Sequence, residues 1–313
     1  MNDSWVLVFP GQGAQVIGMA KDIAEALPEV REMFRQADDI LNAPLSQIIF
    51  EGPEADLVDT SNQQPALVLV GLALKKALSI KLGRPVTCCA AAGLSLGEYA
   101  ALCAVEALSF EDALRLVRRR GELMKMASGL RPSGMAVVMN LSADKIHECC
   151  LKAAQETSGI VSASNFNGGG QIVIGGSLDA LAKASELCKA AGAKRVLKLP
   201  VSGAFHTALM QPAADQFDAV LDHTTILNAT QPVYANVTAA RVQAPAEIRD
   251  ALKQQITHPV LWEQTIQNLV SAGHTQFLEL GPGSSVSNMI KRISSEAQCR
   301  AVSTWADVQT FVP

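Results

Sequence analysis

The pattern Gly-x-Ser-x-Gly at residues 93–97 constrains the fold of this 313-residue chain more than any other feature of its sequence. A small, apolar segment at 86–92 precedes the pattern and predicts a buried strand, and helix-favouring residues at 98–104 follow it. Strand, tight turn and helix in this order are typical of a nucleophile elbow, which lifts the serine hydroxyl to the top of a sheet. Glycines suit the flanks of so sharp a turn because they carry no Cβ. The sequence therefore predicts Ser95 as a nucleophile, with a glycine-rich turn and an incidental serine as the alternative.

Two further segments are expected beside this serine. The N–H of Leu96 lies where the predicted helix begins, and amides at that position point at an oxyanion formed on the serine side. Residues 5–9 predict a buried strand that ends at Pro10, and the flexible loop 11–15 follows it. Ligands of open α/β sheets bind at the carboxyl ends of the strands, so this loop is expected at a ligand site.

Arg120 is the only arginine of three in a row that the helical pattern turns inward. A helix predicted over residues 109–127 starts with an acidic variant of the capping box. On a helical wheel Arg120 falls in the middle of the apolar face, whereas Arg118 and Arg119 fall on the charged face. A buried guanidinium without an anion is very costly. The pattern leaves two interpretations open, an internal ion pair and a socket that binds a substrate carboxylate through two hydrogen bonds.

From Gly134 onward the periodicity changes, and it predicts a second, smaller domain. The expected elements are a strand at 135–139, a helix at 142–157, strands at 160–163 and 171–174, a helix at 177–191 and a strand at 194–199. This β-α-β-β-α-β order matches a ferredoxin-like unit. We therefore predict an α/β fold in which residues 131–200 form a small domain, inserted into a large domain of residues 1–130 and 201–313. The loop 165–170 is expected to be a polar hairpin turn between the two middle strands.

The remaining pattern assigns further helices and a strand to the large domain. Pro65 is expected in the first turn of a helix that runs to about Leu82, because proline is tolerated there. The other elements expected are a helix at 208–222, a helix that ends at 254–259, a strand at 277–280, a turn at 281–283 and a helix from Ser285.

Composition and charge exclude several classes of protein. Hydrophobic residues make up 49% and charged residues 18% of the chain, as in a globular protein with a substantial core. The net charge of -4 provides no basic field for nucleic acid. None of the seven cysteines is spaced C-x-x-C, which favours buried free thiols in a reducing compartment over a metal site or a disulfide framework. No signal peptide or membrane-length apolar run is visible, so the cytoplasm is the expected location.

Among the five histidines, His206 is the best candidate for the base that a serine nucleophile needs. It lies where the predicted small domain returns to the large one, and domain junctions are favoured positions for pockets. The others are expected to be solvated, to cap a helix end or to lie in turns and loops; they are His147, His223, His258 and His274. No acidic residue is clearly placed to orient the imidazole of His206.

Six short motifs in a fixed order give the chain a resemblance to a known family. They are FPGQGAQ at 9–15, GLSLGEY at 93–99, RG at 120–121, NFN at 165–167, GAFH at 203–206 and GPG at 281–283. Together they resemble the malonyl-CoA:acyl carrier protein transacylases over nearly the whole chain. The resemblance implies an α/β-hydrolase-like core with a parallel sheet and a ferredoxin-like insert, and it favours a substrate carboxylate as the partner of Arg120.

The resemblance also implies roles for individual residues. Ser95 is expected to attack the malonyl thioester, and His206 to take its proton and to return one to the leaving thiolate. The backbone amides of Gln12 and Leu96 are expected to hold the oxyanion. A carbonyl of Gln255 is expected to orient the histidine in place of an acid.

Two more positions are expected at the pocket, and a third departs from the residue that is common in the family. Asn165 is expected near its mouth. Phe205 resembles the residue of malonyl-selective members, because its ring would crowd an α-methyl branch, so methylmalonyl selectivity is disfavoured. Many members have histidine where this chain has Leu94, but others have leucine there, and activity is still expected.

The implied partners are malonyl-CoA and holo acyl carrier protein, in a transfer through a malonyl-serine that needs no metal or redox cofactor. A monomer is expected. An acidic carrier protein needs a local basic patch on a chain of negative net charge, and the candidates are Lys189, Lys194, Arg195 and Lys198. Fatty acid and polyketide synthesis are both compatible with these expectations.

Two alternatives belong to other functional classes. A serine esterase or thioesterase shares the elbow, but it gives an inward Arg120 and the Gln12 loop no evident purpose. A catalytically inactive scaffold of the same fold is the second alternative, and the intact set Ser95, Arg120, His206 and Gln255 argues against it.

Overall fold

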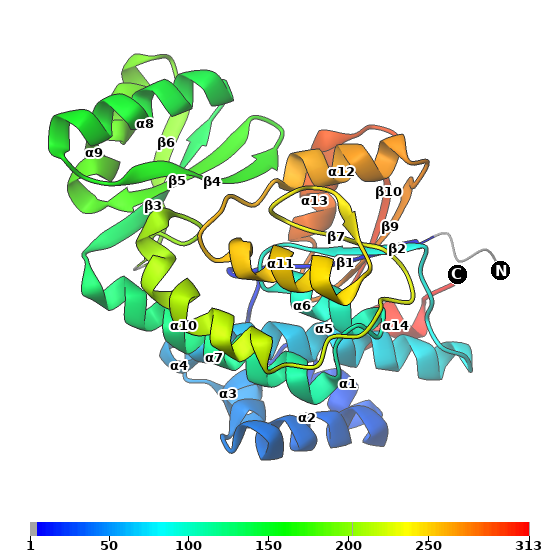
Figure 1. Ribbon diagram of the computed structural model, residues 1–313. Coiled ribbons are helices and arrows are strands. Elements are labelled where there is room, and N and C mark those ends of the chain that lie inside the picture. The colour runs from blue at the N-terminus through cyan, green and yellow to red at the C-terminus, as the bar shows by residue number, and fades with distance from the viewer. Residues whose placement is uncertain (1–4, 202, 313) are drawn as a thin grey trace.

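The computed structural model describes residues 5–201 and 203–312, and it contains two β-sheets flanked by helices (Figure 1). In the larger sheet the strand order is β10-β9-β1-β2-β7-β8. The strands are β1 (Trp5–Phe9), β2 (Ala90–Gly93), β7 (Val233–Tyr234), β8 (Arg241–Val242), β9 (Gln276–Leu280) and β10 (Gln298–Val302). Neighbouring strands are parallel except β7 and β8, which pair antiparallel. The chain is therefore α/β, as predicted.

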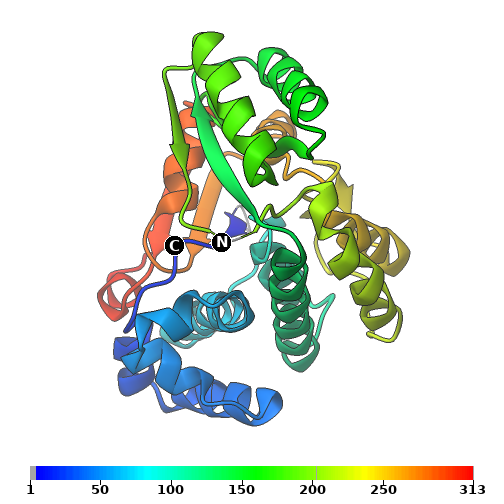
Figure 2. The same cartoon turned by 90° about the vertical axis from the view of Figure 1, so that its left-hand side faces the viewer.

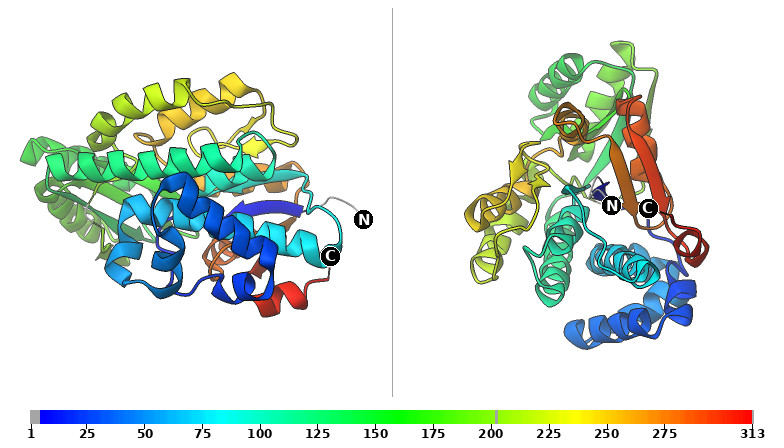
Figure 3. Two further views of the ribbon diagram at one scale, coloured as in Figure 1. Left: turned by 90° about the horizontal axis from the view of Figure 1, so that it is seen from below. Right: turned by 90° about the vertical axis from the view of Figure 1, so that its right-hand side faces the viewer.

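Helices cover both faces of the large sheet, so the central strand β1 is apolar throughout. Val6 and Val8 pack in one core with α12 (Trp262–Ser271) and α13 (Ser285–Ile293). Leu7 and Phe9 point the other way, into a core shared with α5 (Thr60–Leu82), α6 (Gly97–Ala104) and α7 (Phe110–Leu130). The other helices of this part are α1 (Lys21–Ala26), α2 (Pro28–Leu41), α3 (Leu45–Glu51), α4 (Glu54–Val58), α10 (Gln211–Asp222), α11 (Pro245–Gln255) and α14 (Trp305–Gln309), with a 3-10 turn η1 (Ala208–Met210). Figure 3 shows α2 beside α7 beneath the sheet, where the two helices are in contact.

The register of β1 and β2 places the loop after β1 beside the predicted elbow. Phe9 pairs with Gly93, and the N–H of Leu94 donates to the carbonyl of Phe9 at 3.0 Å. Strand β9 lies on the other side of β1 and is also parallel to it. The carboxyl ends of these three strands therefore meet at one edge, which is where ligands bind in sheets of this kind.

The smaller sheet has the order β4-β5-β3-β6, with every pair antiparallel. Its elements are β3 (Ser133–Met139), α8 (Ala143–Thr157), β4 (Val161–Gly168), β5 (Gln171–Ser177), α9 (Leu178–Ala190) and β6 (Arg195–Lys198), in the β-α-β-β-α-β order that the periodicity predicts. Both helices pack on one face of this sheet, against Ala136 and Val138 of β3 (Figure 2). Met135 and Val137, which alternate with them, face the large sheet's helices instead.

Strand β4 also contacts the large part of the molecule. Asn165 forms a parallel bridge with Val260, in the segment between α11 and α12. The N–H of Phe166 donates to the carbonyl of Val260, and the N–H of Val260 donates to the carbonyl of Ser164, each at 2.9 Å. The two sheets are therefore held together by main-chain hydrogen bonds as well as by side chains.

This bridge corrects one expectation. Residues 165–167 lie within β4, not in a hairpin loop; the strand ends at Gly168 and the turn consists of Gly169 and Gly170, and all three glycines have positive φ. Polar residues before glycines are typical of turns, but here the main chain of Val260 pairs with them as a neighbouring strand would. Side chains that alternate along β4 can therefore point toward the large sheet.

The start of α5 is a second correction, because the helix begins at Thr60, which leaves Pro65 beyond its first turn. Asp59 caps it by accepting a hydrogen bond from the N–H of Ser61 at 3.0 Å. Pro65 therefore lies inside the helix, where it lacks the N–H that would bond to the carbonyl of Ser61. The capping residue Asp59, six residues before Pro65, outweighed the proline signal. The strand before the elbow is also shorter than predicted, because β2 begins at Ala90.

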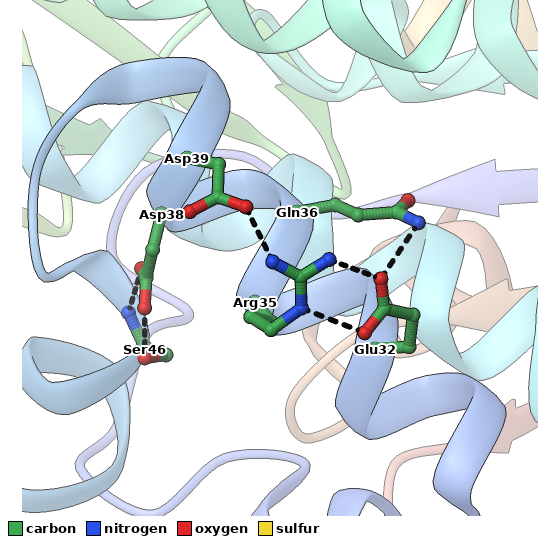
Figure 4. Close-up of polar contacts among 6 residues, drawn as sticks. All are labelled: Glu32, Arg35, Gln36, Asp38, Asp39 and Ser46. Atoms are coloured by element: carbon green, nitrogen blue, oxygen red, sulfur yellow. Dashed lines mark hydrogen bonds and ion pairs between the residues drawn. The ribbon is translucent and has the colours of Figure 1, made fainter.

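Polar contacts at the α2–α3 corner are structural (Figure 4). Arg35 bonds to Glu32 and Asp39, which lie on its own helix and are largely exposed. Such exposed pairs contribute little to stability. Asp38 accepts hydrogen bonds from the N–H and hydroxyl of Ser46, which ties α2 to the first turn of α3.

The described residues contain no helix of the length and apolarity needed to cross a membrane. The seven cysteines are free thiols. Within the same part of the chain, no group of three or more His, Cys, Asp and Glu side chains is arranged to hold a metal ion.

Candidate active site

The turn between β2 and α6 has the geometry of a nucleophile elbow. Ser95 adopts a φ of 55°, in the left-handed region that side chains rarely occupy. A Cβ on Gly93 would lie 1.9 Å from the carbonyl carbon of Gly97, and a Cβ on Gly97 would lie 2.5 Å from the carbonyl oxygen of Phe9. Both clashes are with backbone, so neither position has room for a side chain. The turn thus exposes the Ser95 side chain at the carboxyl edge of the sheet.

Asn236, just after β7, holds this turn in place. Its Oδ1 accepts a hydrogen bond from the N–H of Ser95 at 2.6 Å, and its Nδ2 donates to the carbonyl of Gly93 at 2.7 Å. The side chain is buried, so these bonds form away from water. One amide therefore satisfies polar groups on both sides of a backbone conformation that costs free energy to hold.

His206 pairs with this serine. The hydroxyl oxygen of Ser95 and Nε2 of His206 are 2.8 Å apart, and Nδ1 of His206 lies 2.7 Å from the main-chain carbonyl oxygen of Gln255. A carbonyl only accepts, so Nδ1 carries the proton and the bare Nε2 accepts the serine hydroxyl. Burial and the nearby charge of Arg120 lower the pKa of His206 from 6.5 to about 3. The imidazole is therefore neutral near pH 7 and able to accept a proton.

Arg120 points inward from α7, as its helical pattern predicts, and only 1% of its surface is exposed. Its Nη1 donates to Oε1 of Gln64 at 2.7 Å, and its Nη2 donates to the Ser95 hydroxyl at 3.1 Å and to Oε1 of Gln255 at 2.9 Å. Its guanidinium also lies 5.7 Å from the centre of the Tyr99 ring. Neutral acceptors thus replace the internal ion pair that was one of its two interpretations: among the described residues, no carboxylate lies within 4.0 Å of it.

The buried carboxylate of Glu98 lies close to this guanidinium, with the side chain of Gln255 between them. Oε2 of Glu98, in the first turn of α6, accepts hydrogen bonds from Nε2 of Gln255 at 2.7 Å and from the N–H of Asn236 at 3.0 Å. Burial raises the pKa of Glu98 to about 7, against the opposing effect of those two hydrogen bonds and of the Arg120 charge. Gln255 therefore connects the arginine, the histidine and this glutamate.

A cavity of about 160 Å³ opens in front of Ser95 and His206. Its walls come from both sheets: Gln12 and Leu94 from the large one, and Asn165 from β4 of the small one. The remaining lining residues are Gly11, Met124, Met135, Asn167, Val173, Leu199, Val201 and Phe205. The predicted residues Ser95, His206, Gln12, Asn165 and Phe205 therefore share one cavity, with Arg120 and Gln255 bonded to its back wall.

Leu96 lies behind Ser95 with its side chain buried, at the N-terminal cap position of α6. Within the described chain, its N–H and that of Gln12 donate no hydrogen bond to another protein group. Two amides beside the serine are thus left for an oxyanion to engage.

The other four histidines lie outside the cavity. His147 and His223 are exposed, the latter at the C-terminal cap of α10. His258 bonds to the carbonyl of Gln254 in the turn after α11. His274 contacts Cys89 at 3.4 Å, at the amino ends of the strands and away from the elbow.

Three buried polar residues of the site escaped the sequence analysis. Gln64 bonds to Arg120, Glu98 bonds to Gln255 and Asn236 bonds to both sides of the elbow. Glu98 offered a signal, because it is the only charged residue in an otherwise apolar helix of residues 97–104. Gln64 and Asn236 offered none, since amides are common at the surface.

Three kinds of comparison relate the chain to known proteins. A family model described as an acyl transferase domain matches residues 6–310. The malonyl CoA-acyl carrier protein transacylase of Bacillus subtilis (strain 168) is 41% identical over 297 residues, which cover 95% of this chain and 92% of that protein. The crystal structure of an acyl carrier protein S-malonyltransferase from Vibrio cholerae matches with a TM-score of 0.92 at 37% identity and covers 97% of this chain and 98% of that chain.

A further solved structure is a type II PKS acyl-carrier protein in complex with its malonyl-transacylase. It matches with a TM-score of 0.93 at 39% identity, and the match covers 98% of each chain. The similarity therefore extends over both sheets and the cavity between them.

Proposed function

Because this chain belongs to the acyl transferase family, we propose that it transfers the malonyl group of malonyl-CoA to the phosphopantetheine thiol of holo acyl carrier protein. The observation that carries the proposal is the position of the Ser95 hydroxyl, 2.8 Å from the base His206 and 3.1 Å from the guanidinium of Arg120. A nucleophile next to a buried cation suits an acyl group that ends in a carboxylate.

In the first step the Ser95 oxygen attacks the thioester carbonyl, and Nε2 of His206 takes the hydroxyl proton. The backbone amides of Gln12 and Leu96 stabilise the oxyanion, an effect typically worth about 3 kcal/mol for each donor. The carbon–sulfur bond then breaks, and His206 returns its proton to the thiolate of CoA. Arg120 binds the free carboxylate of the malonyl group, which remains on Ser95 as an ester.

The second step repeats this chemistry in reverse order. His206 takes the proton of the carrier protein's thiol, and the thiolate attacks the malonyl ester. The ester bond breaks and Ser95 recovers its proton. Both steps exchange one acyl bond for another, so they need no metal or redox cofactor.

Gln255 orients His206 through its main-chain carbonyl, 2.7 Å from Nδ1. A neutral carbonyl leaves the imidazole less basic than a buried carboxylate would. Thioesters are activated acyl donors, so this weaker base is sufficient. At the cavity wall, Asn165 borders the mouth and the ring of Phe205 restricts branching at the α-carbon of the acyl group.

The proposal extends to the fold and to the setting of the reaction. The sheet order β4-β5-β3-β6 with two helices on one face supports a ferredoxin-like unit of residues 131–200. The elbow in a largely parallel sheet supports an α/β-hydrolase-like large domain of residues 1–130 and 201–313. Seven free thiols are in keeping with a reducing compartment such as the cytoplasm. A monomer is the proposed state.

Intact mass spectrometry tests the proposed function. Incubation with malonyl-CoA should add one malonyl group to the wild type and none to S95A, and holo acyl carrier protein should remove it with formation of malonyl carrier protein. Rapid release of free malonate without carrier protein would support the esterase alternative. Failure of Ser95 to acquire label would support the inactive scaffold.

A further inference from the structure

Glu98 is a buried carboxylate that the proposed mechanism does not use. It is 2% exposed and sits in the first turn of α6, three residues after Ser95. It belongs to the same hydrogen-bonded group as Arg120, but no oxygen of it lies within ion-pair distance of that guanidinium. The side chain of Gln255 separates the two charges, donating to Glu98 through Nε2 at 2.7 Å and accepting from Arg120 through Oε1 at 2.9 Å.

The chemistry of these groups fixes the direction of the Gln255 amide. A guanidinium only donates hydrogen bonds and a carboxylate only accepts them. An amide between them therefore directs its oxygen to Arg120 and its nitrogen to Glu98. Gln255 also donates to the main-chain carbonyl of Ser95 at 3.1 Å, and its own carbonyl holds His206. The charge of Glu98 thus acts on a residue that also contacts Arg120, His206 and Ser95.

We propose that Glu98 is a positioning residue which serves as the resident counter-charge of Arg120, and that it competes with the carboxylate of the incoming acyl group for that guanidinium. This inference rests on the proposed function, because it assumes an acyl group with a free carboxylate. Two carboxylates near one buried cation repel each other. Binding of the substrate carboxylate therefore favours the protonated form of Glu98, so binding takes up a proton.

The groups around Glu98 indicate that Glu98 itself is the one that takes up the proton on binding. The ionisable groups that act on it are Arg120 from α7 and Tyr99 on its own helix, while His206 lies across Gln255. Burial raises the pKa of Tyr99 above its ordinary value, so the Tyr99 hydroxyl stays protonated. The pKa of His206 is about 3, so the imidazole stays neutral at pH 7 to 8. With a pKa of about 7, Glu98 is the member of this group that titrates in that range.

The pKa of Glu98 determines how the affinity for malonyl-CoA changes with pH. As pH rises through 7, Glu98 ionises and partly neutralises Arg120, so affinity for an acyl group with a carboxylate falls. If the bound carboxylate raises the pKa of Glu98 by about one unit, that affinity falls about tenfold between the protonated and the ionised enzyme. Affinity for a neutral acyl group does not depend on this proton.

The substitution Glu98→Gln isolates the charge. Only Oε2 of Glu98 is engaged in the hydrogen bonds described, so the single carbonyl oxygen of glutamine can accept from both Gln255 and Asn236. Glu98→Asp keeps the charge on a shorter side chain and serves as its control. Both are made in the full chain, on a Ser95→Ala background that binds acyl-CoA without reacting.

Titration calorimetry in buffers of different ionisation enthalpy counts the protons taken up. At pH 7.5, S95A is expected to take up more protons on binding malonyl-CoA than on binding acetyl-CoA, by a fraction of one proton. Acetyl-CoA is the reference because it carries the same phosphates as malonyl-CoA. S95A/E98Q should show no such excess and should bind malonyl-CoA about fivefold more tightly than S95A at pH 8, where the tenfold limit is only partly reached. S95A/E98D should retain the excess.

The inference is overturned if S95A and S95A/E98Q take up the same excess of protons, or if S95A takes up none while binding malonyl-CoA more tightly than acetyl-CoA. Should S95A bind the two ligands equally, the proposed function itself fails, which is a separate outcome. Steady-state kinetics of E98Q supply a second measurement on the reacting enzyme. Its KM for malonyl-CoA should not rise between pH 6.5 and 8, whereas that of the wild type should; a parallel rise in both would contradict the inference.

Discussion

His206 stays uncharged because its burial and the charge of Arg120 oppose its protonation more strongly than its hydrogen bond to Gln255 favours it. Its ring is 4% exposed, and Arg120 places a positive charge nearby. The main-chain carbonyl of Gln255 holds Nδ1–H at 2.7 Å but offers no negative charge. A base of this kind is available at every physiological pH, and its strength is matched to an activated substrate.

The low pKa of His206 predicts that the rate of Ser95 malonylation does not fall as the pH is lowered from neutrality to about 5. A base must be unprotonated, and a pKa lowered from 6.5 to about 3 keeps the imidazole unprotonated well below neutrality. The rate of Ser95 malonylation at saturating malonyl-CoA should therefore stay constant from pH 8 down to about pH 5, measured by rapid quench and mass spectrometry. A fall in that rate with a midpoint near pH 6.5 would mean that His206 has its ordinary pKa.

Arg120→Ala is expected to erode the preference for malonyl over acetyl groups by on the order of a hundredfold, because a buried charge-assisted pair with the substrate carboxylate is lost. Competition between malonyl-CoA and acetyl-CoA for Ser95 measures the preference. Arg118→Ala is the matched control: this neighbour is half-buried and bonds to Asn62. Unchanged preference in R120A would refute the assignment, and an equal loss in R118A would point to damage of α7.

At the scale of elements, the β2–α6 turn is the most demanding feature of the fold. The sequence pattern of residues 93–97 predicted it because few other arrangements need two glycines around a serine. The same kind of local pattern predicted the inward face of α7. It failed at α5, where the cap Asp59 starts the helix early enough to leave Pro65 beyond the first turn, and at β4, where a partner distant in sequence extends the strand.

Gly97→Ala should disrupt the elbow, because its Cβ would lie 2.5 Å from the carbonyl oxygen of Phe9 and 2.8 Å from that of Pro10. Backbone on two sides cannot yield, so we expect a loss of about 3 kcal/mol in the free energy of unfolding, at the upper end of overpacking costs. Malonylation should be lost as well. Gly129→Ala in α7 is the control, since its Cβ meets nothing within 4 Å.

Denaturant unfolding with a circular dichroism readout compares the two variants. The control should gain roughly 0.5 to 1 kcal/mol, because alanine favours a helix interior over glycine. Equal stability of G97A and the wild type would show that the close packing of Gly97 on β1 does not hold in solution.

At the scale of the whole molecule, the cavity exists because the two sheets meet. Gln12 and Leu94 reach it from one sheet and Asn165 from the other, and the Val260 bridge joins the two. The proposed carrier-protein patch runs from the end of α9 along the edge strand β6 of the small sheet. All four of its residues are exposed: Lys189, Lys194, Arg195 and Lys198. Lys189 and Lys198 also border a groove with the apolar side chains of Leu178 and Val196.

Charge reversal of this patch should slow only the second step. K189E/K198E is expected to reduce the rate of malonyl transfer to carrier protein about tenfold at low salt, with less effect at high salt, because surface charges steer association. Malonylation by malonyl-CoA should not change. K81E, in the exposed last turn of α5, is the control. Transfer rates that match the wild type in single-turnover assays would exclude the patch as the docking surface.

The sequence by itself determined the features that depend on neighbouring residues. Two glycines around Ser95 specify the turn, and the periodicity of α7 specifies that Arg120 points inward, because both are matters of local geometry. Its place at the predicted domain junction indicated His206 as the base, and the family resemblance added Gln255.

Only the tertiary structure decided what surrounds these groups. Asn236 reaches Ser95 across 141 positions of the chain, and Gln255 reaches Glu98 across 157. Buried polar groups select partners by distance and by donor or acceptor character once the sheets have packed. No local pattern encodes that selection, which is why the neutral partners of Arg120 and the buried carboxylate of Glu98 emerged from the coordinates alone.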